Sequence, residues 1–537
     1  MTNSVVGASD DPLHGVSDPQ SFWSTLNIGE AMPGVMTPLS WSVWGDPAEC
    51  SMREPLVSMG VLPRRDRGVP ADPTQRGVNI FFGRVAGRVD FLTEMGDGLP
   101  GTNGGQLAER IYGIVPPNYR PSRRRRRYPL IAVMSVHAFL TLPAKLRANQ
   151  LETDQWWRTR IGAVATMSLD EAIDQLADAR ARFRRSVILD GQAVACVVQP
   201  AFEALSALVK RAGAGDVTDF MSGYGEHAET ALVQDMWAAS RGRLSVEQVV
   251  RRHGSHGPNE GELSGRVWRE DDAPLHSALS SWKNMDDDSD PLLVEQRKRD
   301  ERVTLEKKLV DACPGWQRPL AHLALWMAAR GIPMRGVAKA AFLQSLDMAR
   351  VSARKIGACL AERGVIEEPD DIFLLTVNEI PLARQGDWTA VIAERRQRQQ
   401  EYAALTLPET WQGMPVASVA SQSDSEVSEL HGVGVSAGVV EGTVRVILDP
   451  ADPDAEIEPG DILVTRMTDP SWASLMFVSK ALVVDIGGTF NHAAIIAREL
   501  GIPCVVNTKN GSRTLRTGDY CCVNGKTGVI TILERAK

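Results

Sequence analysis

The sequence predicts an α+β protein in which a large, mostly helical domain precedes a small α/β (β/β/α) domain. Between about residues 140 and 400, apolar residues recur three and four positions apart, which is typical of amphipathic helices. After residue 430, short apolar runs alternate with turns, which is typical of strands. The chain has 537 residues, 43% of them hydrophobic, and so has room for two or three domains with packed cores.

Changes in composition along the chain predict four segments. Residues 1–19 are small and polar, so we expect a disordered tail. Residues 20–411 form the helical domain, and residues 430–537 form the α/β domain. Between them, residues 412–429 are rich in Ser, Ala, Val, Gln and Asp and show no periodicity, which predicts a flexible linker.

Local signals place the individual elements. Ser168 is a good N-cap, and the acidic turn after it predicts a helix from Leu169. Asn79–Asp90 alternates enough to predict a short strand or hairpin. Two X-Pro steps, at Pro33 and Pro38, argue against a continuous helix over residues 22–42 and predict an ordered, aromatic-rich loop. The apolar period predicts further helices over Ala201–Val209, Ala228–Ala239, Leu320–Arg330 and Val337–Arg363.

The overall charge and the cysteines limit the classes of function that the sequence allows. A net charge of −8 argues against a general nucleic-acid binder. The seven cysteines show no metal-ligand spacing, so we expect reduced thiols, no metal site and a cytoplasmic protein. We see no signal peptide, and the apolar stretch Pro129–Leu142 is too short to span a membrane. The five arginines of Arg123–Arg127 predict either a solvated face or a docking patch for an acidic partner.

A histidine stands at the start of a predicted helix near the C-terminus. The apolar run Ala481–Val484 reads as a buried strand, and a glycine pair ending at Gly488 interrupts it. Asn491 is a plausible N-cap for a helix that begins at His492. The backbone N–H groups of a first helical turn favour an anion and disfavour imidazolium, so this ring would be neutral and nucleophilic. A single histidine in this position is more often a cap or surface residue, and spacing alone leaves both readings open.

The segment Gly487–Pro503 closely resembles the phosphohistidine signature of the phosphoenolpyruvate (PEP)-utilising enzyme family. The resemblance continues through Gly432–Gly438, Asp469–Trp472 and Val523–Gly528. It implies a swivelling domain whose histidine, His492 here, carries a phosphoryl group. It also implies phosphate contacts from Gly488, Thr489 and Asn491. Asn491 replaces the usual Ser or Thr, so we expect altered phosphate contacts without loss of function.

A loop rich in histidine and carboxylates lies inside the helical region. Gly and Pro exclude a helix over residues 253–264, and the residues alone suit a hydrogen-bonded corner or, more weakly, a metal site. The loop resembles part of the acceptor site of rifampin phosphotransferase-like and PEP synthase-like proteins. That resemblance makes His256, Glu260 and Glu262 candidates for orienting or deprotonating a hydroxyl group.

The same resemblance supplies further site residues. It extends over residues 22–42, where it implies acceptor contacts from Pro38 and Trp41, and it includes Trp268 after the loop. Relatives often carry Arg-Glu and then Lys where we align Arg330, Gly331 and Met334. Either Arg330 or Arg335 is therefore the candidate to steady the phosphate.

The resemblance implies a relay in which a donor phosphorylates the histidine, the domain swings, and the phosphoryl group passes to an acceptor. We see no segment resembling the family's ATP-grasp or PEP-binding domain, so we expect a split enzyme like phenylphosphate synthase and the cresol-phosphorylating synthases. A separate ATP-grasp subunit would bind ATP and Mg²⁺, and the overall reaction would convert ATP, water and a phenol or aromatic alcohol into AMP, phosphate and a phosphate monoester. The alternatives are a component of a rifamycin-type antibiotic phosphotransferase and a non-catalytic phosphocarrier or regulatory subunit.

Overall fold

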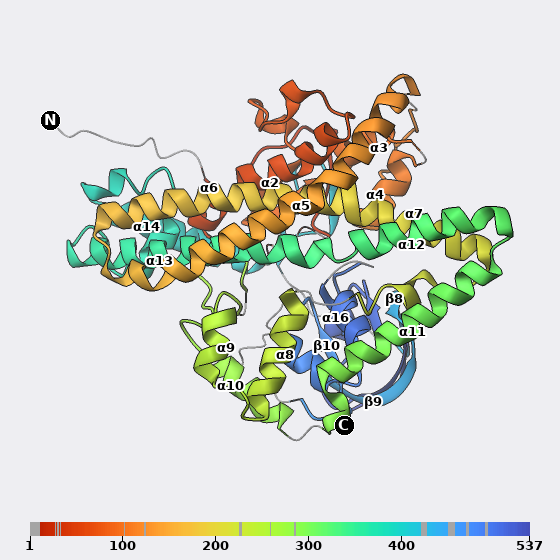
Figure 1. Ribbon diagram of the computed structural model, residues 1–537. Coiled ribbons are helices and arrows are strands. Elements are labelled where there is room, and N and C mark those ends of the chain that lie inside the picture. Colours follow the sequence, from red (N-terminus) through yellow and green to blue (C-terminus); the bar gives the residue numbers. More distant parts are fainter. Residues whose placement is uncertain are drawn as a thin grey trace.

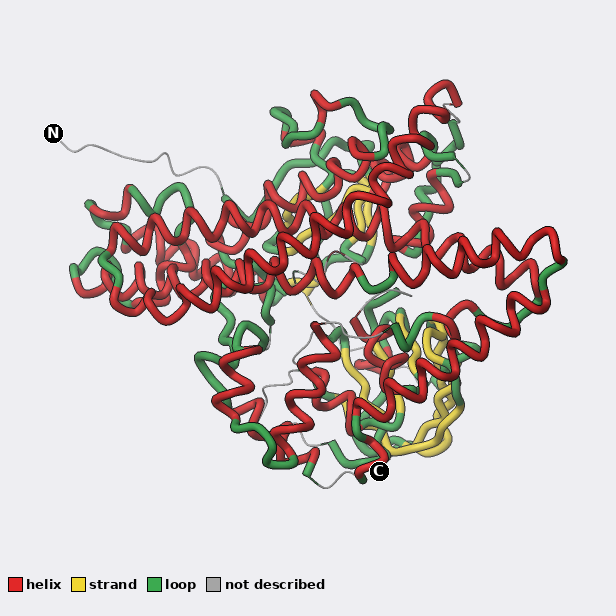
Figure 2. The backbone as a smooth tube through the Cα atoms, viewed as in Figure 1, coloured by secondary structure: helices red, strands yellow, loops and turns green. Residues whose placement is uncertain are grey.

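A bundle of long helices lies above a compact β-rich domain in the computed structural model (Figure 1). The structure describes residues 11–536 except 27, 29–31, 33, 101, 123–124, 225–227, 258, 284–285, 420–426, 449–456, 469–471 and 489–491. The side chains of some further residues, His492 among them, also lie outside the described part. Figure 2 shows helices through most of the chain and strands concentrated near the C-terminus, which confirms the predicted α+β class.

The helical domain carries a small sheet with strand order β2-β3-β1-β5 and a two-stranded β4–β6 pair. The strands are β1 (Phe22–Ser24), β2 (Val78–Phe81), β3 (Arg84–Arg88), β4 (Leu405–Thr406), β5 (Thr410–Gln412) and β6 (Ser418–Val419). The α-helices are α2 (Pro38–Ser58), α3 (Val89–Gly96), α4 (Gly104–Tyr112), α5 (Tyr128–Arg160), α6 (Leu169–Ala193), α7 (Gln199–Ala212), α8 (Ala228–Ser240), α9 (Val246–His253), α10 (Ala273–Trp282), α11 (Pro291–Ala312), α12 (Arg318–Gly331), α13 (Met334–Glu362) and α14 (Thr389–Ala403).

The C-terminal domain is built on an eight-stranded sheet with strand order β7-β14-β13-β9-β10-β11-β12-β8. Its central strands β9 to β12 run parallel, and β10 and β11 are buried along their whole length. The elements are β7 (Glu429–His431), β8 (Val433–Ser436), β9 (Val439–Val446), β10 (Ile462–Thr465), α15 (Ala473–Val478), β11 (Ala481–Val484), α16 (His492–Leu500), β12 (Cys504–Val506), α17 (Gly511–Thr514), β13 (Tyr520–Asn524) and β14 (Val529–Glu534).

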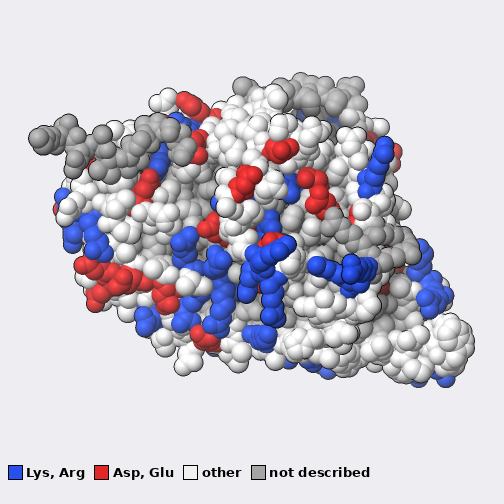
Figure 3. Space-filling view, turned by 90° about the horizontal axis from the view of Figure 1, so that it is seen from above, with Lys and Arg blue, Asp and Glu red and all other residues white. Residues whose placement is uncertain are grey.

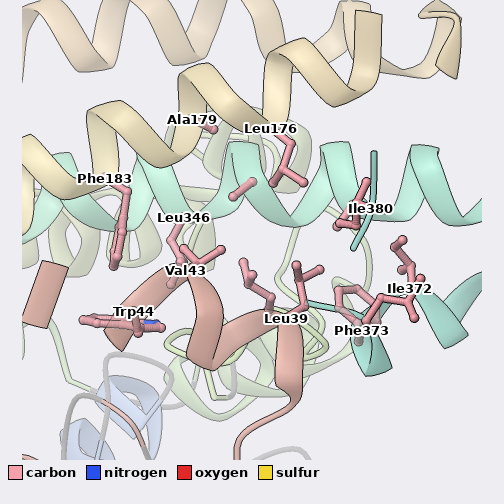
Figure 4. Close-up of a cluster of buried hydrophobic side chains, with 14 of the residues drawn as sticks. Leu39, Val43, Trp44, Leu176, Ala179, Phe183, Leu346, Ile372, Phe373 and Ile380 are labelled. Carbon is pink, nitrogen blue, oxygen red and sulfur yellow. The ribbon is translucent and has the colours of Figure 1, made fainter. Parts of the chain in front are cut away.

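The main core of the helical domain lies where α2, α6 and α13 pack together. Figure 4 shows Trp44 of α2 and Phe183 of α6 pointing toward each other, and their ring centroids are 4.6 Å apart in an edge-to-face arrangement. Leu346 of α13 fills the space beside Val43. This apolar burial fixes the orientation of α2 and α13, the two helices on which the candidate site is built.

The structure corrects three predictions about the segments that flank this core. Residues 11–19, predicted to be disordered, pack against the small sheet, because Leu13 is buried and the Gly15 amide donates to the Ile80 carbonyl. The predicted loop over residues 22–42 ends at Pro38, which occupies the first turn of α2 behind the Thr37 cap, a position where proline starts a helix. The predicted linker 412–429 is partly ordered, since β6 pairs with β4.

Two helical stretches are long and apolar enough to span a membrane by length and composition, namely Tyr128–Thr166 and Leu169–Ala212. The first contains the apolar stretch that the sequence analysis considered too short. Both pack along α13 in the helical bundle.

Seen from above (Figure 3), both charge signs are spread over the helical face, with basic side chains gathered toward one edge. Arg126 and Arg127 are exposed just before α5, whereas Arg123 and Arg124 lie outside the described residues.

Candidate active site

The helix that carries His492 is packed closely onto the C-terminal sheet. Helix α16 begins at His492 and contacts β8, β11, β12 and α15. Ala493, Ala494 and Ala497 are fully buried, and their small side chains let the helix approach the strands. The N-terminal end of the helix is therefore held in place by packing. The side chain of His492, and all of Thr489 and Asn491, lie outside the described residues, so the predicted cap and phosphate contacts there stay predictions.

The loop before α16 is anchored by Asp485, which directly follows β11. Its buried carboxylate accepts hydrogen bonds from the Thr508 hydroxyl at 2.9 Å and from the Ser512 amide at 2.9 Å. Next along the loop, Gly488 has no heavy atom of the described residues within 4 Å of the position that a Cβ atom would take. The loop is thus fixed at one end and has open space beside the glycine that the resemblance assigns to phosphate binding.

In the helical domain, the structure brings His256 and Glu260 together. The His256 Nδ1 atom lies 2.9 Å from a Glu260 carboxylate oxygen, and both residues are buried. When Nδ1 carries the hydrogen, it donates to the carboxylate and leaves Nε2 with its lone pair. The Lys339 ammonium of α13 lies 3.7 Å from the other Glu260 oxygen and offsets its charge. The arrangement is that of an oriented histidine base.

Glu262, the third residue predicted in this loop, points to a different place. Its carboxylate accepts hydrogen bonds from the Thr37 hydroxyl at 2.8 Å, the Thr37 amide at 3.2 Å and the Ser40 hydroxyl. It therefore sits at the N-terminus of α2, where a negative charge is favourable. The contacts of Glu262 join the loop to α2, while His256 pairs with Glu260.

Arg350 holds the loop from the opposite side. This guanidinium is fully buried and donates to the carbonyl oxygens of Glu260 at 2.8 Å and Glu262 at 3.1 Å. Its charge is offset by Asp347, which also accepts from Arg269 at 2.7 Å. A buried arginine that ties down two loop carbonyls restricts the backbone that carries the two glutamates.

The predicted phosphate-binding arginines separate in the structure. Arg330, near the end of α12, donates to the Leu140 carbonyl of α5 at 3.0 Å. Arg335 lies in the first turn of α13, and both Arg335 and Lys339 act electrostatically on Asp190 of α6. Burial raises the pKa of Asp190 to about 6, although these two cations act to lower it. Lys339, which the sequence analysis missed, is thus the cation beside Glu260, and its signal was the four-residue spacing from Arg335 on one helix.

The three residues predicted to contact the acceptor also differ in position. Pro38 is buried at the start of α2, and Trp41 is half-buried against the main core. Trp268 is buried, its backbone amide donates to the His256 carbonyl at 2.8 Å, and its ring centroid lies 6.1 Å from that of His256. Of these three residues, Trp268 is the one that contacts His256 in the described structure.

A second histidine lies beside the pair. His253 Nε2 is 2.8 Å from an Asp235 oxygen, and its ring centroid is 6.4 Å from that of His256. Burial lowers the pKa of His253 to about 4, despite the hydrogen bond with Asp235 that acts to raise it. His253 is therefore uncharged at neutral pH. Within the described part of the chain, no three His, Cys, Asp or Glu side chains gather in a way that could hold a metal.

Helix α16 and the segment that follows the His256 loop belong to one packed body. A single cluster of buried side chains contains Trp268 from that segment, Trp237 and Trp282 from α8 and α10, and Ala493 and Ala494 next to His492. Residues 457–528 match the family profile of the PEP-utilising enzyme, mobile domain. These residues belong to the mobile-domain family of PEP-utilising enzymes. This confirms the resemblance seen in the signature around His492.

Relatives of known sequence extend the match beyond the mobile domain profile. A protein named rifampicin phosphotransferase from Streptomyces sviceus is 41% identical over 180 residues, which are 33% of this chain and 20% of the relative. The uncharacterised phosphotransferase YvkC of Bacillus subtilis is 36% identical over 201 residues, covering 35% of this chain and 24% of that protein. The matched segments thus span between a fifth and a quarter of the lengths of these relatives. A solution structure of Enzyme I matches with a TM-score of 0.16 at 13% identity, over 62% of this chain and 80% of that one, which carries no argument.

Proposed function

We propose that this chain relays a phosphoryl group through His492 to a hydroxyl acceptor that reacts beside His256 and Glu260. The observation that carries the proposal is the shared buried cluster, in which Trp268, just after the His256 loop, and the alanines that follow His492 pack into one body. A carrier histidine and an oriented base on two elements of the same body suit a two-step transfer.

In the first step, a neutral ring nitrogen of His492 would attack a phosphorus atom of the donor, forming a P–N bond as the donor leaving group departs. In the second step, the acceptor oxygen would attack that phosphorus, the P–N bond would break, and the hydroxyl proton would pass to Nε2 of His256. Glu260 would hold the ring in the required tautomer. Lys339, which lies 3.7 Å from Glu260, would steady the phosphoryl oxygens together with Arg335, one helical turn before it.

The donor we propose is ATP, bound with Mg²⁺ on a separate ATP-grasp protein; one phosphoryl group would pass to His492, water would take the other as inorganic phosphate, and AMP would be left. The acceptor we propose is a phenol or aromatic alcohol, since Trp268 gives the His256 side of the site an apolar wall. A rifamycin-type acceptor is the runner-up, supported by the name of the Streptomyces relative. We place the protein in the cytoplasm, as its reduced cysteines suggest.

A labelling experiment tests the relay. This chain is mixed with a candidate ATP-grasp protein, Mg²⁺ and ATP labelled in turn at its β- and γ-phosphates, and then phenol or rifampicin is added. We expect acid-labile label on His492 and then alkali-stable label on one acceptor. His492→Ala should remove both signals while the circular dichroism spectrum is retained. Label on the acceptor in the His492→Ala sample would refute the relay.

A phosphocarrier without its own small-molecule chemistry is the second candidate. His256 and Glu260 are only 8% and 5% exposed, and a cavity of about 660 Å³ lies away from them, between α11 and the mobile domain. A buried base is less accessible to a small acceptor. Transfer from phosphorylated His492 to phenol, with no other protein present, would exclude this second candidate.

A further inference from the structure

Three aromatic rings meet where the mobile domain contacts the helical domain. Phe477 of α15 stacks on Trp282 of α10, with ring centroids 4.3 Å apart and an interplanar angle of 27°. Trp237 of α8 completes the group at 6.0 Å from Phe477 and 6.4 Å from Trp282. One ring thus comes from the mobile domain, and the two indoles that receive it come from the helical domain.

This aromatic contact is buried, and Arg241 supports it on the helical side. Trp282, Trp237 and Phe477 are 0%, 3% and 8% exposed. The Arg241 guanidinium lies 4.1 Å from the Trp237 ring centroid and donates to the Trp282 carbonyl at 3.2 Å. Arg241 therefore ties the two indoles of different helices together, so that the site for Phe477 keeps its shape.

The other side of the same interface is lined by charged side chains and encloses a cavity. A cavity of about 660 Å³ lies between α11 and the mobile domain there, next to direct contacts between α11 and α16. Its walls include Arg297 and Asp300, which are exposed, and Lys298, whose Nζ lies 3.3 Å from the position of a Cβ atom at Gly501. Solvated charged side chains contribute little to a contact, so this side can separate at small cost.

We infer that Phe477, Trp237 and Trp282 form a clasp that holds the mobile domain in the docked position, and that release of Phe477 is the step that lets the domain move. Helix α15 packs on α16, so the element that enters the clasp is coupled directly to the helix that starts at His492. The inference rests on the proposed relay in one respect, because the relay is what requires the domain to move. The clasp itself is a property of this chain alone.

Phe477→Ala tests the clasp in the intact chain without nucleotide. Losing one buried phenylalanine from the docked state should raise the ratio of released to docked protein roughly 10- to 100-fold. We expect a larger maximum dimension in small-angle X-ray scattering and a red-shifted tryptophan emission, because Trp237 and Trp282 become solvated. Trp316→Ala, which removes an indole that is 74% exposed on the surface, is the control; it should leave the maximum dimension unchanged and should not shift the emission to the red.

Trp282→Ala approaches the clasp from the helical side, so a fault in folding of the mobile domain cannot explain both results. It should expand the scattering profile as Phe477→Ala does, and the double variant should add little to either. Unchanged scattering in both single variants, with normal circular dichroism, would overturn the clasp. Failure of the relay would appear as missing label on His492 while these scattering changes remain, so the two hypotheses fail separately.

Discussion

The His256 Nδ1 atom lies 2.9 Å from a carboxylate oxygen of Glu260, and this contact defines the orientation of the candidate base. Replacing Glu260 by Gln removes the charged acceptor that favours hydrogen on Nδ1. We expect transfer from phosphorylated His492 to the acceptor to slow about 100-fold, with loading of His492 unchanged. Single-turnover transfer of label from the purified phosphoprotein measures this rate.

Glu262→Gln is the control for that variant, because Glu262 lies in the same loop but caps α2. It should lower the free energy of unfolding by about 1 kcal/mol and change the transfer rate only a few-fold. Equal losses of transfer rate in the two variants would show that the loop as a whole, and not the His256–Glu260 pair, determines the rate.

Substitutions of Lys339 and Arg330 should affect the transfer rate differently and so identify the cation that steadies the phosphate. Lys339 Nζ lies 3.7 Å from a Glu260 oxygen, whereas Arg330 is bonded to the Leu140 carbonyl on α5. Lys339→Met keeps most of the apolar stem and removes the charge, and we expect at least a tenfold slower transfer. Arg330→Met should stay within threefold of the wild type in the same assay. A larger loss of transfer rate in Arg330→Met than in Lys339→Met would instead identify Arg330 as the phosphate-steadying cation.

Elements governed by neighbouring residues could be predicted from the sequence. The Ser168 cap and its capping box with Glu171 start α6 as expected, since all the atoms involved lie within three residues. The apolar run of β11 is likewise buried along its length. The helix that starts at His492 also follows from local signals.

Contacts between distant segments could not be predicted in this way. Glu262 is 225 residues from Thr37, and nothing local shows that its carboxylate caps α2. Lys339 reaches Glu260 because α13 packs against the loop. Pro38 was assigned to a loop because proline breaks helices, but at the first turn it lacks only an N–H that would have no helical partner.

The burial of Asp190 predicts a pH effect on stability. Burial raises the pKa of this carboxyl to about 6 from an ordinary 3.8. Between those pH values the folded chain holds a proton that the unfolded chain has released, so stability is fully present below pH 4. It falls by up to about 3 kcal/mol as the pH rises through 6. Asp190→Asn should remove this loss in urea unfolding from pH 4 to 8, and exposed Asp288→Asn should keep it.

His253 predicts the opposite trend over nearly the same range. Burial lowers its pKa to about 4 from 6.5, so the unfolded chain binds a proton that the folded chain excludes. Its contribution is fully present above pH 6.5, and up to about 3 kcal/mol is lost as the pH falls to 4. His253→Gln should therefore lose less stability on acidification than the wild type. Exposed His276→Gln is the control, and an identical acid loss in both variants would contradict the assignment.

Alanine substitutions at Gly488 and Gly525 should have different effects, the first on labelling of His492 and the second on stability. A Cβ atom at Gly525 would lie 2.0 Å from the Ser436 carbonyl oxygen, whereas one at Gly488 would meet no atom within 4 Å in the part of the chain that the structure describes. Gly525→Ala should destabilise the mobile domain by about 2 kcal/mol or more, because the clash is with backbone. Gly488→Ala should leave stability within about 0.5 kcal/mol but slow labelling of His492 about tenfold, since the methyl group enters the space left for phosphate. Denaturant unfolding and the initial rate of labelling measure the two effects, and wild-type labelling by Gly488→Ala would place the phosphate elsewhere.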